Sequence, residues 1–222
     1  MDIKKDTMTT PVLYTCARSR GLRATWAAEE AGVDIDLKIL PFPPRYLAPE
    51  YLEINPLGTV PLLVDGESRM TESCAIAHYL ATREGYTPLA IAPGERDYAE
   101  YCDHTYHADA TITFPQTVYM RFAIFEKDKG WAEAGLAYAK WFHKRLVKIE
   151  QRLEGREFLC ADRFTVADIC VGYALILAES VGLDDGVPES LKEYRARLTA
   201  RDGYKRAFER EEAGRLALEQ PA

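Results

Sequence analysis

The stretch GTVPLLVDGESRMTESCAIAHYLATREG, residues 58–85, contains the signals of a complete hairpin and a helix. Its apolar residues 60–64 indicate a short buried strand, and the Asp-Gly pair at 65–66 predicts a tight hairpin turn. Residues 68–70 then supply the returning strand, and the apolar spacing that follows predicts a helix over 73–84. A strand–turn–strand–helix unit of this kind indicates an α/β domain.

Pro61 stands at the beginning of the first of these strands. Proline lacks the main-chain N–H that a central strand donates, so the residue marks an edge strand, a turn or a cis peptide bond. We expect a cis bond between Val60 and Pro61, because the chain must enter the sheet at an angle. The N–H and C=O of Val60 would then point outward, where an extended peptide ligand can pair with them as an added strand.

Glu72 and Ser73 stand at the start of the expected helix. One interpretation is a helix cap, because serine often caps a helix and glutamate suits the first turn. The other is a ligand site, since free N–H groups and the positive helix end bind a carboxylate, with the Ser73 hydroxyl as a further donor. Glu72 would then pair with an ammonium group. A ligand with an amino-acid head and a peptide tail satisfies Glu72, Ser73 and Val60 together.

The residues before this stretch alternate between strand and helix signals. The expected elements are, in order, a strand at 11–15, a helix at 22–31, a strand at 35–40 and a proline-rich break at 41–44. Gly32 occupies the usual position past a helix C-cap. Together with the opening stretch, these signals predict an α/β domain over residues 9–86.

The second half of the chain carries only helix signals. Helices are expected at 94–126, 131–153, 165–183 and, as one or two surface helices, 189–212. Pro115 predicts a kink or a break inside the first of them. The linker lies near residues 87–94, where two prolines and a glycine cluster. An all-helical domain is therefore predicted over residues 95–215.

The composition is that of a globular chain that can bury a core, since 47% of its residues are hydrophobic. The net charge of −7 argues against nucleic acid as the main partner. No apolar run is long enough to span a bilayer and residues 1–6 lack a signal-peptide core, so we expect a cytoplasmic protein with no membrane partner. The five cysteines contain no Cys-x-x-Cys pair, so we expect reduced thiols.

Two widely separated motifs resemble those of a known family. Residues 55–63, NPLGTVPLL, followed by residues 71–76, TESCAI, resemble the glutathione-binding half of the cytosolic glutathione S-transferases, whose pattern there is Asn-Pro-x-Gly-x-Val-Pro and then Glu-Ser. Residues 158–169, FLCADRFTVADI, resemble the capping-box segment before the central helix of that family. The resemblance implies a thioredoxin-like N-terminal domain, an all-helical C-terminal domain and, commonly, a homodimer.

The resemblance also implies an activity. A glutathione S-transferase activates the thiol of glutathione, its co-substrate, and conjugates it to a small hydrophobic electrophile. Val60 and Pro61 would hold the peptide backbone of glutathione, and Glu72 and Ser73 its amino-acid head. Three alternatives remain open: a glutathione-dependent thiol reductase or peroxidase, an isomerase, and a non-catalytic binding protein of the same fold.

The thiol-activating group is expected at the end of the first strand or in the turn after it, within residues 14–21, YTCARSRG. Several serine- and cysteine-type classes keep their catalytic residue where this chain has Arg18, which departs from the family pattern. Ser19 is the nearest hydroxyl and ranks first. Cys16, which suits a mixed disulfide with glutathione, ranks second, and Tyr14 at the strand end ranks third. Each also has a structural interpretation: a helix cap, a small buried residue and a core residue, respectively.

The electrophile pocket is expected between the domains, against the long helix. Four side chains fall there: Tyr101, His104, Tyr106 and His107. We expect no metal, because Asp103 and His107 share a helical face that His104 does not. Three further aromatic residues at helical spacing are expected in the core or in a pocket wall: Phe114, Tyr119 and Phe122.

Thr165 and Asp168 precede and begin the expected central helix. A threonine three residues before an acidic residue is the sequence signature of a capping box, in which each side chain satisfies a main-chain N–H of the other. We expect this pair to be purely structural.

Overall fold

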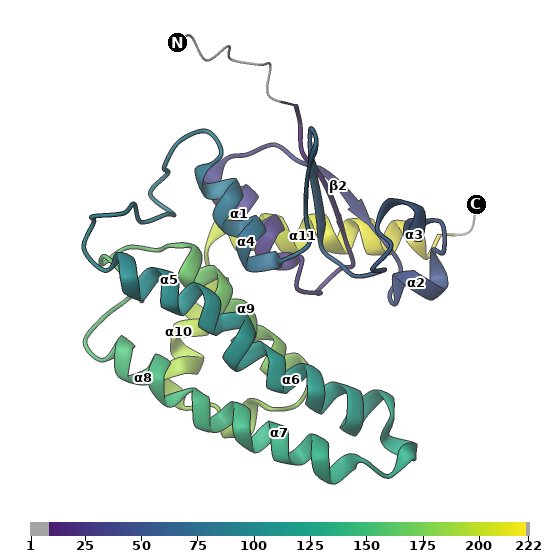
Figure 1. Cartoon of the computed structure of the whole chain (residues 1–222). Coiled ribbons are helices and arrows are strands. Elements are labelled where there is room, and N and C mark those ends of the chain that lie inside the picture. The colour runs from purple at the N-terminus through teal and green to yellow at the C-terminus, as the bar shows by residue number, and fades with distance from the viewer. Residues whose placement is uncertain (1–8, 221–222) are drawn as a thin grey trace. The chain divides into compact units, whose positions relative to one another are not determined.

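The computed structural model describes residues 9–220 (Figure 1). Contacts along the chain divide it into two compact units. An α/β unit holds the described residues up to Leu80 together with those from Asp202 onward, and a helical unit holds Ala81–Arg201. The C-terminal helix α11 (Asp202–Leu218), yellow in Figure 1, therefore belongs to the α/β unit, although the helical domain expected over 95–215 contained most of it.

The α/β unit is built on a four-stranded mixed sheet with the strand order β2-β1-β3-β4. Strand β1 (Val12–Thr15) runs parallel to β2 (Asp36–Ile39) and antiparallel to β3 (Leu62–Asp65). Strand β3 pairs in turn with β4 (Ser68–Met70) through the expected hairpin. Gly66 in its turn has φ 58°, a left-handed conformation that glycine adopts without strain.

Pro61 leads into β3 through a cis peptide bond with Val60, as expected. The strand expected over 60–64 begins only at Leu62, because proline has no N–H to donate to a strand ladder. A second cis bond, which the sequence did not suggest, joins Phe42–Pro43.

One face of the sheet carries two single-turn helices, α2 (Pro44–Leu47) and α3 (Tyr51–Ile54), in and after the expected proline-rich break. Tyr51 is 1% exposed and donates its hydroxyl to the main-chain carbonyl of Thr59 at 2.8 Å. It forms a small core cluster with Ala48 and Leu62. This cluster fixes the chain that leads into the cis peptide.

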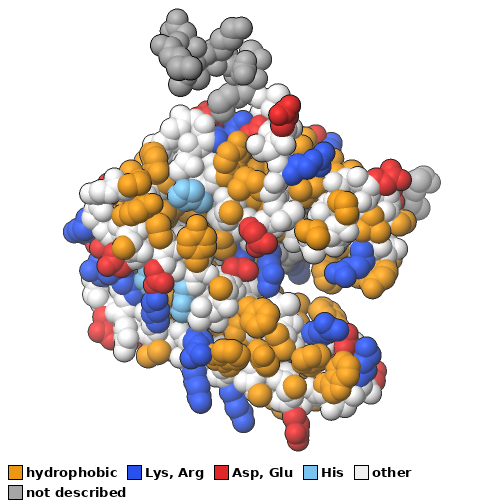
Figure 2. Space-filling view, viewed as in Figure 1, with side chains coloured by type: hydrophobic (Ala, Val, Ile, Leu, Met, Phe, Trp, Pro, Cys, Tyr) orange, Lys and Arg blue, Asp and Glu red, His pale blue; other side chains and the backbone are white. Residues whose placement is uncertain are grey.

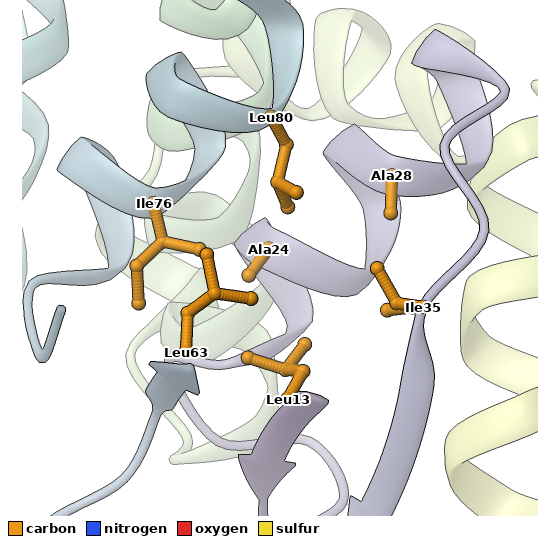
Figure 3. Packing of buried hydrophobic residues seen from close by; sticks show 7 residues of the cluster. All are labelled: Leu13, Ala24, Ala28, Ile35, Leu63, Ile76 and Leu80. Carbon is orange, nitrogen blue, oxygen red and sulfur yellow. The ribbon is translucent and has the colours of Figure 1, made fainter. Parts of the chain in front are cut away.

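The other face of the sheet carries α1 (Leu22–Ala31) and α4 (Ser73–Thr82). Figure 3 shows the core that they form with the sheet: Leu13 and Leu63 from the strands, Ala24 and Ala28 from α1, Ile76 and Leu80 from α4, and Ile35. Both helices begin where the sequence predicts, and Gly32 ends α1 in the left-handed conformation, with φ 69°. The N-terminal ends of α1 and α4 are joined by a polar contact, because Arg23 of α1 donates to Ser73 of α4.

Helix α11 packs on α1 and β2 through ion pairs and one close backbone approach. Glu29 of α1 pairs with Arg206 at 2.9 Å and with Arg210 at 2.6 Å. Gly214 lies so near β2 that a Cβ there would be 2.4 Å from Cγ1 of Ile39. These contacts are the physical reason why the last helix of the chain belongs to the α/β unit.

The helical unit contains six α-helices among the described residues: α5 (Tyr98–His107), α6 (Phe114–Tyr119), α7 (Ala132–Arg145), α8 (Val147–Leu153), α9 (Val166–Ser180) and α10 (Glu189–Thr199). The long helix expected over 94–126 starts only at Tyr98 and contains two π-helical turns, Ala108–Thr113 and Met120–Phe125. The first of these turns directly precedes α6, where Pro115 occupies the first helical turn. The expected break at Pro115 thus takes the form of a π-helical turn.

Helix α9 is the buried centre of the helical unit, as its apolar sequence predicts. Its start is fixed by the expected capping box between Thr165 and Asp168, in which both reciprocal bonds are present. Asp168 is fully buried and also accepts bonds from the N–H of Leu159 at 2.9 Å and the hydroxyl of Tyr194 at 2.6 Å. The pair is a folding device, as expected.

The surface of the helical unit carries exposed hydrophobic side chains near the end where α6 and α7 meet (Figure 2). They include Phe114, Phe125, Trp131 and Leu136, which are 46–61% exposed. Among the described residues, no helix combines the length and the apolar character needed to cross a membrane.

Candidate functional site

Three segments of the α/β unit meet around the first turn of α1. Gly21, the residue before α1, lies beside Pro61, since a Cβ on Gly21 would be 3.5 Å from the Cβ of Pro61. Arg23, in the first turn, donates from Nη1 to the Ser73 hydroxyl at 2.9 Å. The structure therefore brings the turn after β1, the cis peptide and the start of α4 to one helix N-terminus.

Arg23 determines the direction in which the Ser73 hydroxyl can donate. Arg23 is fully buried and Ser73 is 3% exposed. Because a guanidinium only donates hydrogen bonds, the oxygen of Ser73 accepts this bond and the hydroxyl keeps its own hydrogen. No acceptor for that hydrogen occurs among the residues that the structure describes. The Ser73 hydroxyl therefore keeps a hydrogen that it can donate to a further acceptor.

Glu72 occupies the N-cap position of α4, since its carbonyl accepts the N–H of Ile76 at 2.9 Å. Ser73 is thus the first helical residue and not the cap. The Glu72 side chain is exposed, and within residues 9–220 no side chain or main-chain group bonds to its carboxylate. A free carboxylate beside a hydroxyl donor and a helix N-terminus suits a zwitterionic amino-acid group.

The main-chain N–H and C=O of Val60, like the Glu72 carboxylate, have no hydrogen-bond partner within residues 9–220. The side chain of Val60 packs on the cluster of Ala48, Tyr51 and Leu62, which orients the residue. One peptide unit of an extended ligand can therefore pair with Val60 on both sides.

The Ser19 hydroxyl belongs to a partly buried pair with Thr15. Their oxygens are 3.0 Å apart, the Thr15 hydroxyl also reaches the carbonyl of Cys16 at 3.2 Å, and Ser19 Oγ accepts the N–H of Gly21 at 3.2 Å. Because Thr15 has one hydroxyl hydrogen, it donates either to the carbonyl of Cys16 or to Ser19, and the hydrogen of Ser19 is free for another acceptor only in the second arrangement. The main-chain N–H of Ser19 is not free, because it donates to Cys16 at 3.1 Å. Ser19 can therefore donate to a ligand sulfur through its hydroxyl alone.

Cys16 is buried in the same turn, with 1% of its surface exposed. Its Sγ lies 3.6 Å from the carbonyl oxygen of Pro41. Burial, and then the charge of Glu211, raises the pKa of the Cys16 thiol to about 12. A thiol with a raised pKa stays protonated at neutral pH, whereas a reactive cysteine has a lowered pKa and is partly ionised.

Tyr14 is half-buried on the opposite side of β1 from Leu13. Its ring centre lies 5.8 Å from that of Tyr51, and it packs on the same cluster as Val60. It also lines a groove of about 810 Å³ between β2, α3 and α11. Tyr14 thus packs against the same cluster as Val60, whereas Ser19 is not part of that cluster.

Comparison with known proteins places this geometry in context. The family described as "Glutathione S-transferase, N-terminal domain" matches residues 17–83, which contain Ser19, Val60, Glu72 and Ser73. The bacterial glutathione S-transferase BphK, solved as a ternary complex, is 25% identical with a TM-score of 0.76, and the match covers 90% of this chain and 98% of that one. Residues 17–83 therefore match the N-terminal domain of the glutathione S-transferases, and the chain is similar to members of that family along most of its length.

Two curated relatives agree with this assignment. Glutathione S-transferase 3 of Schizosaccharomyces pombe is 23% identical over 226 residues, covering 93% of this chain and 90% of the relative. Glutathione S-transferase GST-4.5 of Xanthomonas campestris is 28% identical over 144 residues, covering 62% of this chain and 68% of the relative. A sphingomonad glutathione S-transferase solved with glutathione shares the fold, with 24% identity, a TM-score of 0.77 and coverage of 90% and 98%.

The residues expected to line the electrophile pocket differ in exposure. Tyr101 and His104 are 1% and 3% exposed, and burial lowers the pKa of His104 to about 4. His107 is half-buried, whereas Tyr106 and Phe114 are 68% and 48% exposed. Only the exposed members of the set present their side chains for contact with a small molecule.

Sequence reasoning missed three residues that make side-chain contacts around the turn after β1 and the starts of α1 and α4: Thr15, Arg23 and Glu211. Arg23 had a signal, because it falls four residues before Ala27 on the apolar face of α1, where a cation needs a partner. Thr15 sits at an ordinary strand end. Glu211 had no signal, since it reaches Thr25 across 186 residues of sequence.

Cys16 is expected to resist alkylation in the folded protein. A pKa of about 12 lies well above that of an ordinary thiol, so at neutral pH we expect reaction with iodoacetamide to be at least about 100-fold slower than for a free cysteine peptide. Peptide mapping by mass spectrometry after timed labelling measures this, with the half-buried Cys102 as internal comparison. Rapid labelling of Cys16 would show that the turn opens, and Cys16 would then again be a candidate nucleophile.

Proposed function

We propose that this chain is a glutathione transferase that conjugates the glutathione sulfur to a small hydrophobic electrophile. The observation that carries the proposal is the convergence of a free peptide unit at Val60, a free carboxylate at Glu72 and a directed hydroxyl at Ser73 around the start of α1. That set complements an amino-acid head followed by a peptide tail, which is the chemistry of glutathione. The glutathione complex of the structurally similar sphingomonad enzyme supports the same ligand.

Each residue has a defined role in this proposal. Val60 pairs with the peptide of glutathione, and Pro61 presents Val60 at the bend. Glu72 binds the ammonium group, and Ser73 donates to the carboxylate of the same amino-acid head. Binding at these points places the thiol end of the ligand toward the turn that contains Ser19.

Ser19 is proposed as the thiol-activating residue. An ordinary thiol with pKa near 8.5 is only a few per cent ionised at neutral pH. Lowering that pKa by two units requires about 2.7 kcal/mol of preferential thiolate stabilisation. The groups proposed to supply it are the N-terminus of α1 and the Ser19 hydroxyl, in the arrangement in which Thr15 donates to the Ser19 oxygen. The thiol proton leaves to solvent, and the thiolate then forms a C–S bond with the electrophile. In a substitution the electrophile releases its leaving group with the electron pair of the broken bond, and in an addition its double bond takes up that pair and a proton from solvent.

The burial of Cys16 favours a transferase over a thiol reductase that would use that residue. The unpaired carboxylate of Glu72 favours ligand binding over a purely structural role, because a scaffold has no use for an amino-acid clamp. We further infer a homodimer in the cytoplasm, as the family resemblance implies. Sedimentation in solution and cell fractionation test those two inferences.

Glu72→Gln is expected to weaken glutathione binding about 10- to 100-fold, because it removes a charge that pairs with the ligand ammonium and costs roughly 1.5–3 kcal/mol. Isothermal titration calorimetry with glutathione measures the change. Glu67→Gln is the matched control, since Glu67 is an exposed glutamate in the hairpin turn before the same helix. Equal affinity of the two variants would remove Glu72 from the site.

The activity itself is tested on the wild-type protein. We expect glutathione to bind at millimolar concentration or below and a reactive aromatic electrophile to be conjugated. Binding without any conjugation across a panel of electrophiles would support the non-catalytic alternative, and no binding would contradict both.

A further inference from the structure

Glu211 of α11 is a buried carboxyl that the proposed function does not use. It is 1% exposed, and each of its oxygens holds one donor. Oε2 accepts the main-chain N–H of Arg18 at 2.9 Å, and Oε1 accepts the Thr25 hydroxyl at 2.8 Å. One side chain from the end of the sequence therefore ties the turn after β1 to the first half of α1.

Arg18 needs this support because of its backbone conformation. It has φ 61°, the left-handed region, which costs a residue other than glycine roughly 1–2 kcal/mol. Helix α11 holds its side chain as well, through a 2.7 Å bond from Nε to Glu212 and a guanidinium placed 5.4 Å from the ring centre of Phe208. Since Ser19 follows Arg18 directly, the peptide that Glu211 holds also sets where the Ser19 hydroxyl points.

Helix α11 is itself held firmly enough to act as a support. The ring of Trp26 in α1 packs edge-on against Tyr204 with the centres 5.0 Å apart. The ion pairs of Glu29 with Arg206 and Arg210 lie on the same helix pair. These contacts dock the helix independently of Glu211, which leaves the carboxyl free to act on the turn.

We propose that Glu211 is a positioning residue for thiol activation, which holds the Arg18 peptide and Thr25 so that the Ser19 hydroxyl faces the glutathione sulfur. This inference rests on the proposed function, because it concerns the same turn. It adds the C-terminal helix to the machinery of the glutathione site. Glu211 itself touches neither the ligand nor the reacting sulfur.

The charge of Glu211 provides a signature for this role. Burial raises the pKa of Glu211 to about 7, against the bonds from Arg18 and Thr25, and Glu212 adds to the rise. The titratable groups that face it are Cys16 and Arg18 in the turn and Glu212 on its own helix, with Thr25 the polar neighbour from α1. The carboxyl therefore changes charge near neutral pH, directly against the Arg18 amide.

The test compares Glu211→Gln with Glu29→Gln. A glutamine at 211 offers one acceptor and turns an N–H₂ group toward the second donor, so the turn loses its support. We expect the thiol pKa of bound glutathione to rise by about one unit or more, and kcat/KM to fall about tenfold or more. The dissociation constant for glutathione should stay within about twofold, because Val60, Glu72 and Ser73 are intact. Glu29→Gln weakens the packing of α11 on α1 without touching the turn. It should leave the thiol pKa of bound glutathione unchanged, and it should change kcat/KM and the dissociation constant by no more than about twofold.

The Arg18 amide gives a readout that needs no ligand. In the wild-type protein its NMR signal should titrate with a midpoint near pH 7, matching the pKa of about 7 for Glu211, and this titration should vanish in Glu211→Gln but persist in Glu29→Gln. A folded Glu211→Gln protein with the wild-type thiol pKa, or an Arg18 amide with an unchanged titration, would overturn the inference. Absence of glutathione binding by the wild-type protein would instead contradict the proposed function, and the amide titration would still decide whether Glu211 holds the turn.

Discussion

Replacing Asp168 with alanine is expected to lower the free energy of unfolding by about 3–4 kcal/mol, because buried donors without an acceptor cost about 1–3 kcal/mol each. Asp168 is fully buried and accepts from the N–H groups of Leu159 and Thr165 and from the hydroxyl of Tyr194. The Thr165 hydroxyl donates to the same carboxyl at 3.0 Å, so removing the carboxyl leaves four donors without this acceptor in the interior. Burial also raises the pKa of Asp168, so relief from burying the carboxyl offsets part of the loss and keeps the effect below the full sum.

Urea unfolding of Asp168→Ala against the wild-type protein measures this loss. Asp103→Ala is the matched control, since Asp103 is 57% exposed and pairs with Lys148 on the surface, where a salt bridge contributes about 0–1 kcal/mol. If the two variants lost the same stability, the capping box would not be the organising feature of α9.

Replacing Gly21 with alanine is expected to cost about 3 kcal/mol of stability, at the upper end for overpacking, and to abolish thiol activation. Gly21 has φ −62° and ψ −23°, which alanine adopts easily, and on backbone grounds alone the change would stabilise the protein by about 0.4–1 kcal/mol. The steric effect decides the sign, because the new Cβ would lie 1.8 Å from the Oγ1 and 2.6 Å from the Cβ of Thr15. The clash displaces the hydroxyl that supports Ser19.

A double-mutant cycle separates the clash from any general effect of the substitution. Thr15→Gly removes both clashing atoms, so Gly21→Ala should cost about 1–3 kcal/mol less in that background. Thermal or urea unfolding of the four proteins gives the coupling energy. Additive losses would mean that the turn yields to the methyl group and that Thr15 does not set its shape.

The elements with strong local signals were predictable from the sequence. Helix α1 and strand β4 have the expected bounds, the Val60–Pro61 bond is cis, and Gly32 ends its helix as expected. Each of these depends on neighbouring residues, through periodicity, a turn pair or the chemistry of proline. The proposed ligand-binding residues Val60, Pro61, Glu72 and Ser73 were named as candidates for the same reason, since they lie in one short stretch with local signals.

The elements without local signals were not predictable. Helices α2 and α3 are one turn each, which is too short for a periodic pattern to emerge. The two π-helical turns are six residues each, which is too short to show a period of their own, so the long helix looked continuous apart from Pro115. The partnership of Arg18 with Glu211 joins residues 193 positions apart, and no pattern within a window reports such a contact.

Helix α11 is the last helix of the chain to be synthesised, although it packs on elements that are synthesised first. The sheet and the first helices of the α/β unit leave the ribosome early, but the carboxyl that holds the Arg18 peptide arrives with the last helix. Contacts of such long separation form late, after loop closure over most of the chain. A chain that ends before Glu211 contains the residues of the sheet and of the α4 start, but it lacks the carboxyl that accepts the Arg18 N–H and the Thr25 hydroxyl. The turn that carries Ser19 therefore gains this support only when the last helix has been synthesised.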